Sequence, residues 1–155
     1  MTIGYEGRTL DDFIATLQAE HVDVLMDVRL NAISRKPGFS KKALATAAEA
    51  AGIEYRHEPS LGNPRDNRDA YRAGDKRARA RYRKQITGSE AVDELIALAG
   101  KRRVALLCVE RDHSICHRDE LARVALKLAP GLMAVHTPQQ IRAEGYTNSA
   151  IPLTQ

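Results

Sequence analysis

The sequence predicts a single α/β domain with a mostly parallel sheet of about five strands and helices on both faces. Short apolar runs alternate with longer amphipathic segments, which is the order of strand–helix–strand units. Connections of that length favour parallel strands, because a parallel pair needs a crossover rather than a hairpin. The 155 residues, 43% hydrophobic and 28% charged, suit one domain, residues 1–155, with its own hydrophobic core.

The first half of the chain predicts three strands and two helices. The strands are residues 2–5 (TIGY), 23–29 (DVLMDVR) and 53–58 (IEYRHE). The first helix, residues 9–21, has Thr9 in the N-cap position and places apolar side chains on one face. The second, residues 40–52, begins at Ser40 and ends at a glycine, a common C-terminal signal.

The second half predicts three helices and two strands. Residues 68–85 are rich in alanine and arginine, both good helix formers, and predict one basic helix. The other predicted elements are a helix over 89–100, a buried strand over 102–110, a helix over 116–129 and a last strand over 131–137.

Two features of the sequence bear on its environment. No apolar run approaches the ~20 residues that span a bilayer, and the N-terminus lacks the basic-then-apolar order of a signal peptide. We therefore expect a cytoplasmic protein without membrane contact, whose two cysteines are reduced thiols.

The positive charge of the chain is concentrated in one segment. Residues 63–85 contain nine Arg and Lys against three Asp, a net +6, whereas the whole chain carries +4. Arg77 and Arg81 alternate with small residues there, and Tyr71 and Tyr82 could stack on bases. This composition is typical of phosphate or nucleic-acid contacts, but no base-reading motif accompanies it.

Polar side chains follow four of the predicted strands. The first strand ends in Gly4–Gly7, the second in Asp27 and Arg29, the third in His57 and Glu58, and the fourth in Cys108 and Glu110. In open parallel sheets ligands bind at the carboxyl ends of the strands. We therefore expect these residues to form one site.

The segment 106–118 (LLCVERDHSICHR) carries both cysteines of the chain. Glu110 follows Cys108 by two residues, so the two side chains share a side if the strand continues. Cys116 and His117 begin the next helix, where the helix dipole and Arg118 would stabilise a thiolate. Such a segment could supply a nucleophile, an anion cradle or a soft-metal site.

Spacing narrows these alternatives. The Cys-x7-Cys-His pattern matches no common zinc ribbon or finger, although Cys108, Cys116 and His117 could still bind a transition metal. A phosphatase-like or sulfurtransferase-like loop would place Arg six residues after its Cys, where this chain has Ser114 and Ala122. A Cys-x-x-Cys redox pair is also absent from the sequence.

Five segments together resemble the DUF-488 family, a domain of unknown function. They are TIGYEGRTLDDFI, VLMDVRLNAISRKPGFSKKAL, GIEYRHEPSLG, ALLCVERDHSICHRDELA and VHTPQQIRAEGY, in this order. The most specific motif is Cys-x-Glu…Cys-His-Arg, and the next is Asp-x-Arg with a downstream Ser-Arg and Phe. Tyr5 and Glu6 stand where a smaller polar residue is expected in the second place, which weakens any role for Glu6.

The resemblance implies an α/β fold with a shared polar site, and it supplies no reaction. The segment VLMDVR is also similar to the second strand of rhodanese-type domains, whose Cys-to-Arg loop spacing this chain lacks.

Three functional interpretations follow. The first is an enzyme acting on an anionic, phosphate-bearing substrate such as a nucleotide or nucleic acid. Its catalytic candidates are Glu110, Cys116, His117, Arg118, Cys108 and Asp27, and its substrate-binding candidates are Tyr5, Arg29, Ser34, Arg35, His57, Arg77 and Arg81. The second is a non-catalytic nucleic-acid-binding module that uses residues 65–84. The third is a metal-binding protein that uses Cys108, Cys116 and His117; otherwise no cofactor is expected.

The first interpretation carries an expectation for one arginine. If Arg29 clamps an anion, Arg29→Ala weakens ligand binding and leaves the thermal melt nearly unchanged.

Overall fold

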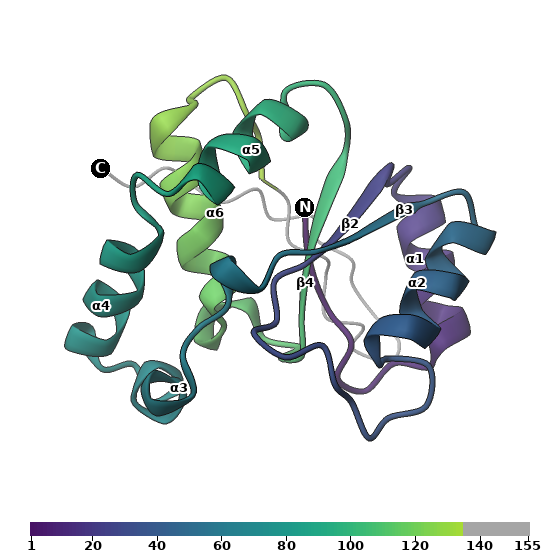
Figure 1. The fold of residues 1–155 in the computed structure, drawn as a ribbon, viewed down its shortest axis with the longest axis horizontal. Coiled ribbons are helices and arrows are strands. Elements are labelled where there is room, and N and C mark those ends of the chain that lie inside the picture. The colour runs from purple at the N-terminus through teal and green to yellow at the C-terminus, as the bar shows by residue number, and fades with distance from the viewer. Residues whose placement is uncertain (135–155) are drawn as a thin grey trace, which may run out of the picture.

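The computed structural model describes residues 1–134 and confirms the α/β fold (Figure 1). Its strands are β1 (Thr2–Gly4), β2 (Val24–Asp27), β3 (Glu54–His57) and β4 (Val104–Cys108). They form one sheet in the order β1-β4-β2-β3, and every neighbouring pair is parallel. The carboxyl ends of all four strands therefore meet at one edge.

The fifth strand, expected over residues 131–137, is absent from the part of that range that the structure describes. Residues 131–134 contain no strand, and residues 135–137 lie outside the described residues. The four strands that the structure describes already give the predicted mostly parallel sheet.

Helices α1 (Leu10–Ala19) and α2 (Lys41–Ala50) cover one face of the sheet. The N-cap hydroxyl of Thr9 accepts a hydrogen bond from Asp12 N, as its place in the sequence predicts. Apolar side chains of these helices and of the sheet form one buried cluster, which includes Phe13, Leu17, Leu25, Leu44 and Leu107.

Four helices and a short 3₁₀ turn, η1 (Pro59–Leu61), lie on the other side of the sheet. The helices are α3 (Arg65–Arg72), α4 (Lys76–Ile86), α5 (Glu90–Ala99) and α6 (His117–Leu128), with a second 3₁₀ turn, η2 (His113–Ile115), before α6. Their core is a second buried cluster, which includes Met26, Tyr82, Leu95, Leu106 and Leu121. The parallel strands thus have apolar side chains on both faces, as expected for a covered sheet.

The single basic helix predicted over residues 68–85 is wrong. Two helices replace it, because Gly74 adopts φ +83° and Asp75 starts a new helix. The Asp75 carboxylate accepts a hydrogen bond from Ala78 N at 2.8 Å, which is an N-cap contact. The turn lets α4 pack against both α3 and α6.

No helix within residues 1–134 is long and apolar enough to cross a membrane.

Gly4 allows two chain segments to approach closely at the carboxyl edge. A Cβ at this position would lie 1.9 Å from the carbonyl oxygen of Glu110. We expect Gly4→Ala to lower the free energy of unfolding by about 1–3 kcal/mol, because the backbone around Glu110 must move. Urea unfolding measures this change. Gly100→Ala is the control, since its nearest contact would be 3.5 Å; equal stability of the two variants would contradict the steric account.

Candidate active site

The carboxyl edge brings together residues from β4 and from the start of α6. Cys108 is the last residue of β4, and Cys116 is the N-cap of α6. The two sulfurs and Nδ1 of His117 all lie within 4.8 Å of one another. Nδ1 is 3.9 Å from the Cys108 sulfur and 3.8 Å from the Cys116 sulfur, and all three side chains are buried.

The orientation of the His117 ring is fixed from its other side. Nε2 lies 2.9 Å from the carbonyl oxygen of Val28, just beyond β2. A carbonyl oxygen only accepts, so Nε2 carries the proton and donates. The Tyr82 ring packs edge-on against the imidazole, with 5.3 Å between the two ring centres. In the neutral ring, the Nδ1 lone pair is therefore directed at the two sulfurs.

Arg118 and Glu110 surround this cluster. Arg118 is 1% exposed, and its Nε donates to the Cys116 sulfur at 3.1 Å while its terminal nitrogen donates to the Glu110 carbonyl at 2.6 Å. The Glu110 carboxylate accepts from Arg72 at 2.7 Å through Oε1. Its other oxygen, Oε2, is buried without a hydrogen-bond partner in the described part of the chain. Arg118, a catalytic candidate from the sequence, is thus a hydrogen-bond donor to a cysteine and a main-chain carbonyl.

The two thiols differ in acidity. Burial opposes ionisation of Cys116, but the Cys108 thiol, Arg118 and His117 lower its pKa well below the usual range. The Cys116 sulfur and burial raise the pKa of Cys108 well above the usual range. Burial also disfavours the His117 cation, but the Cys116 sulfur raises the pKa of the imidazole. The cluster therefore favours a negative charge on Cys116.

Glu110 is held as a carboxylate. Burial raises the pKa of Glu110, but the hydrogen bond from Arg72, a main-chain contact and the two thiols lower it to about 2. The carboxylate is thus ionised at neutral pH.

Asp27 and Arg29 form a buried ion pair beside this cluster. Arg29 donates from Nε and a terminal nitrogen to the Asp27 carboxylate, at 2.8 and 2.5 Å. The remaining terminal nitrogen of Arg29 donates to the Phe39 carbonyl at 2.7 Å and to the Tyr5 hydroxyl at 3.4 Å. Tyr55 donates to Asp27 at 2.6 Å. These contacts leave Arg29 little capacity to bind a substrate.

Other predicted residues support the loops around this ion pair. The Tyr5 hydroxyl donates to Ser34 Oγ at 3.2 Å. His57 Nε2 donates to the Arg29 carbonyl at 2.9 Å. Ser34 Oγ in turn accepts from Lys36 N. The sequence predicts these residues at the carboxyl edge of the sheet. Their hydrogen bonds connect the loop after β2 to the residue that follows β1 and to the end of β3.

Three predicted arginines lie apart from the cluster. Arg35 and Arg77 are exposed, and Arg81 pairs with Asp66 on the surface. Arg72 and Arg83 likewise pair with Glu110 and Glu120. Part of the positive charge of residues 63–85 is thus neutralised within the molecule, and nucleic-acid binding by this segment stays a prediction.

A cavity of about 130 Å³ opens beside the cluster. Its walls include Cys108, Glu110 and His117, whereas Cys116 does not line it. The other lining residues are Arg29, Leu30, Asn31, Ile33, Asn63, Arg68, Tyr71, Arg72, Val109 and Ile115. Sequence reasoning missed Asn63 and treated Arg68 and Arg72 only as members of the basic segment, because nothing in their spacing shows that α3 reaches the strand ends.

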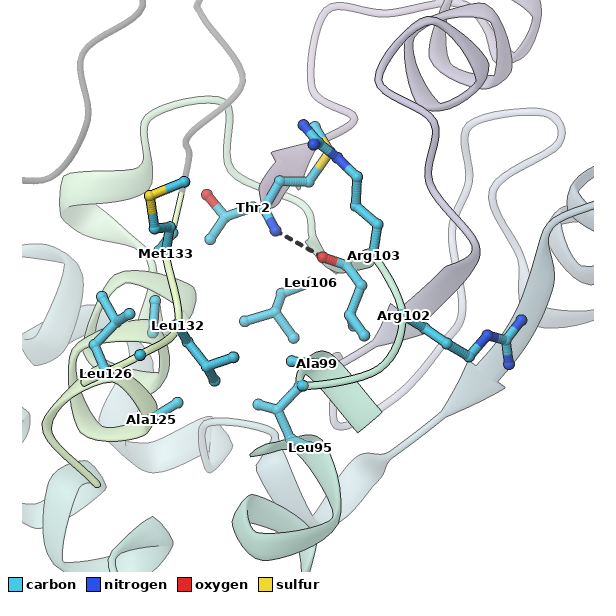
Figure 2. Close-up of a pocket in the computed structure, with 16 residues that line it drawn as sticks. Thr2, Leu95, Ala99, Arg102, Arg103, Leu106, Ala125, Leu126, Leu132 and Met133 are labelled. Atoms are coloured by element: carbon cyan, nitrogen blue, oxygen red, sulfur yellow. Dashed lines mark hydrogen bonds between the residues drawn. The ribbon is translucent and has the colours of Figure 1, made fainter. Parts of the chain in front are cut away.

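A larger cavity of about 390 Å³ lies at the opposite, amino-terminal edge of the sheet (Figure 2). Leu95, Ala99, Leu106 and Ala125 lie around it, while the Arg102 side chain points away. Its described walls contain no Cys, His, Asp or Glu. Among the described residues that line the two cavities, the candidate catalytic residues are therefore found only at the smaller one.

Comparison with known protein families gives a match over most of the chain. The family described as "Domain of unknown function DUF488" matches residues 9–125. No curated protein and no solved structure matches the chain.

Proposed function

This chain belongs to the DUF488 family, and we propose that it is a metal-dependent enzyme in which Cys108, Cys116 and His117 bind a zinc-class transition-metal ion. Two thiolates and an imidazole are ligands that such ions prefer. The ion would occupy the carboxyl edge of the sheet, beside the cavity of about 130 Å³.

The orientation of His117 carries this proposal. A metal-bound histidine usually donates its second ring N–H to a carboxylate or carbonyl oxygen. His117 already makes this bond to Val28, with Nδ1 turned to both sulfurs. A tetrahedral zinc ion holds sulfur and nitrogen ligands about 3.6 Å apart. The present distances of 3.9 and 3.8 Å need to shrink by only a few tenths of an ångström.

The position of the cavity favours a catalytic rather than a structural metal. Catalytic zinc has three protein ligands and an open position, whereas structural zinc has four. Cys108 and His117 line the cavity and Cys116 lies behind them. The fourth position of a metal held by these three residues would therefore face the cavity, where water or substrate can enter.

A thiol nucleophile fits these observations less well. Cys116 has the lower pKa, but it is 1% exposed and does not line the cavity. Cys108 does line the cavity, but its pKa is raised. Neither cysteine combines acidity with access to a substrate.

A bound metal would polarise a substrate oxygen or lower the pKa of a bound water. The chain itself supplies the surroundings of that chemistry. Arg118 donates to the Cys116 sulfur and holds this ligand in place. The Glu110 carboxylate, held by Arg72 and ionised at neutral pH, supplies a fixed negative charge at the cavity wall.

Metal analysis of protein purified without chelator tests the proposal. We expect near one equivalent of zinc or a similar metal per chain, and its loss in Cys116→Ser and His117→Gln. His57→Gln is the matched control, because His57 also donates from Nε2 to a loop carbonyl but lies outside the cluster. Failure to take up zinc even after reconstitution, or equal uptake by Cys116→Ser, would refute the proposal.

A further inference from the structure

We infer that Asn63, Arg68 and Arg72 form a phosphate-binding subsite in the same cavity, so that the substrate is a small phosphate-bearing molecule. This inference rests on the proposed function for its chemistry, since the metal and the subsite would act on one substrate. The three residues lie before or within α3 and form part of the cavity wall with Cys108 and His117.

The amide of Asn63 has a fixed orientation. Asn67 Nδ2 donates to the Ala78 carbonyl at 2.9 Å, so the nitrogen of that amide is identified by its acceptor. The same nitrogen donates at 2.9 Å to Asn63, which must therefore present its oxygen. The Nδ2 group of Asn63 consequently points elsewhere.

That nitrogen is available to a ligand. Asn63 is 4% exposed, and its Nδ2 has no hydrogen-bond partner in the described part of the chain. This nitrogen is not fully shielded from solvent. Asn63 also forms part of the cavity wall. A buried amide with two unused donors is costly unless a ligand or water accepts from them.

Arg68 supplies an uncompensated charge. Its Nε donates to the Asn63 carbonyl at 3.1 Å, which fixes the guanidinium. No carboxylate within residues 1–134 pairs with it, whereas Arg29 pairs with Asp27 and Arg72 with Glu110. Of the three arginines that line the cavity, Arg68 therefore provides its net positive charge. The terminal nitrogens of Arg68 remain free to bind an anion as a fork.

The size and the donors of the cavity favour phosphate. About 130 Å³ is well below the roughly 300–1,000 Å³ of pockets for drug-sized ligands, so one small group fits. Asn63, Arg68 and Arg72 all line the cavity and all carry N–H donors, and donors from three residues suit the three terminal oxygens of a phosphoryl group better than the two of a carboxylate.

Calorimetric titration of the full-length, zinc-loaded protein with inorganic phosphate tests the subsite. We expect Asn63→Asp and Arg68→Gln each to weaken phosphate binding about tenfold or more, because one adds negative charge and the other removes the free cation. Asn63→Asp keeps the oxygen that Asn67 binds, so the fold should persist. Arg65→Gln, an exposed arginine of the same helix outside the cavity, should change binding less than about twofold.

Three results would overturn the inference. The first is an absence of phosphate binding at millimolar concentration by the zinc-loaded protein. The second is a loss of phosphate affinity in Arg65→Gln as large as that in Arg68→Gln. The third is tighter binding of acetate than of phosphate. Repeating the titration after chelation separates the two proposals. Arg68-dependent phosphate binding by a protein that takes up no zinc would uphold the subsite and refute the metal centre.

Discussion

Zinc is expected to raise the melting temperature of the metal-free protein by roughly 8–16 °C. A ligand that binds only the folded state adds about 4 kcal/mol when its free concentration is 1,000 times its Kd. In a chain of this size, each kcal/mol raises the melting temperature by about 2–4 °C. The gain arises because only the folded state brings the end of β4 and the start of α6 together to form the metal site.

Thermal unfolding with and without zinc measures this shift. His117→Gln should abolish the response, since it removes the ligand nitrogen. His57→Gln should keep it, because this side chain only contacts the Arg29 carbonyl. A melting temperature that zinc leaves unchanged in the unmodified protein would contradict the prediction.

Arg29→Ala is expected to lower the free energy of unfolding by about 3–5 kcal/mol. The substitution leaves the Asp27 carboxylate, which is 0% exposed, as a buried charge without its cation. It also removes the donors to the Phe39 carbonyl and the Tyr5 hydroxyl. This expectation replaces the one drawn from the sequence, in which the loss of Arg29 leaves the melt nearly unchanged.

Urea unfolding distinguishes the two expectations for Arg29. Arg35→Ala is the matched control, because Arg35 follows in the same connection but is exposed. We expect its effect to stay within about 0.5 kcal/mol. If Arg29→Ala were as stable as Arg35→Ala and bound its ligand more weakly, the result would contradict this prediction and support the interpretation that Arg29 clamps an anion.

The fold was largely predictable because its strands and helices have distinct apolar periods. Residues 23–29 and 102–110 are apolar enough to indicate strands buried on both faces, and they contain β2 and β4. The break between α3 and α4 was missed because alanine and arginine dominate that segment. The signal was present locally, in a glycine followed by an aspartate that caps the next helix.

The site was predictable in outline but not in its geometry. The grouping of Cys108 with Cys116 follows from a strand end and the next helix start, which the sequence shows. The His117 bond to Val28 depends on β2 lying beside β4, and the order of strands in a sheet is not a local property. For the same reason the sequence could not show that α3 brings Asn63 and Arg68 to the cavity.

X-ray absorption at the zinc edge of the reconstituted protein tests the central claim most directly. The metal centre predicts two sulfur ligands at about 2.3 Å, one imidazole nitrogen at about 2.0 Å and one light ligand in the open position. Cys108→Ser should reduce the sulfur count to one. A spectrum of the unmodified protein with only oxygen and nitrogen neighbours would contradict a metal held by Cys108, Cys116 and His117.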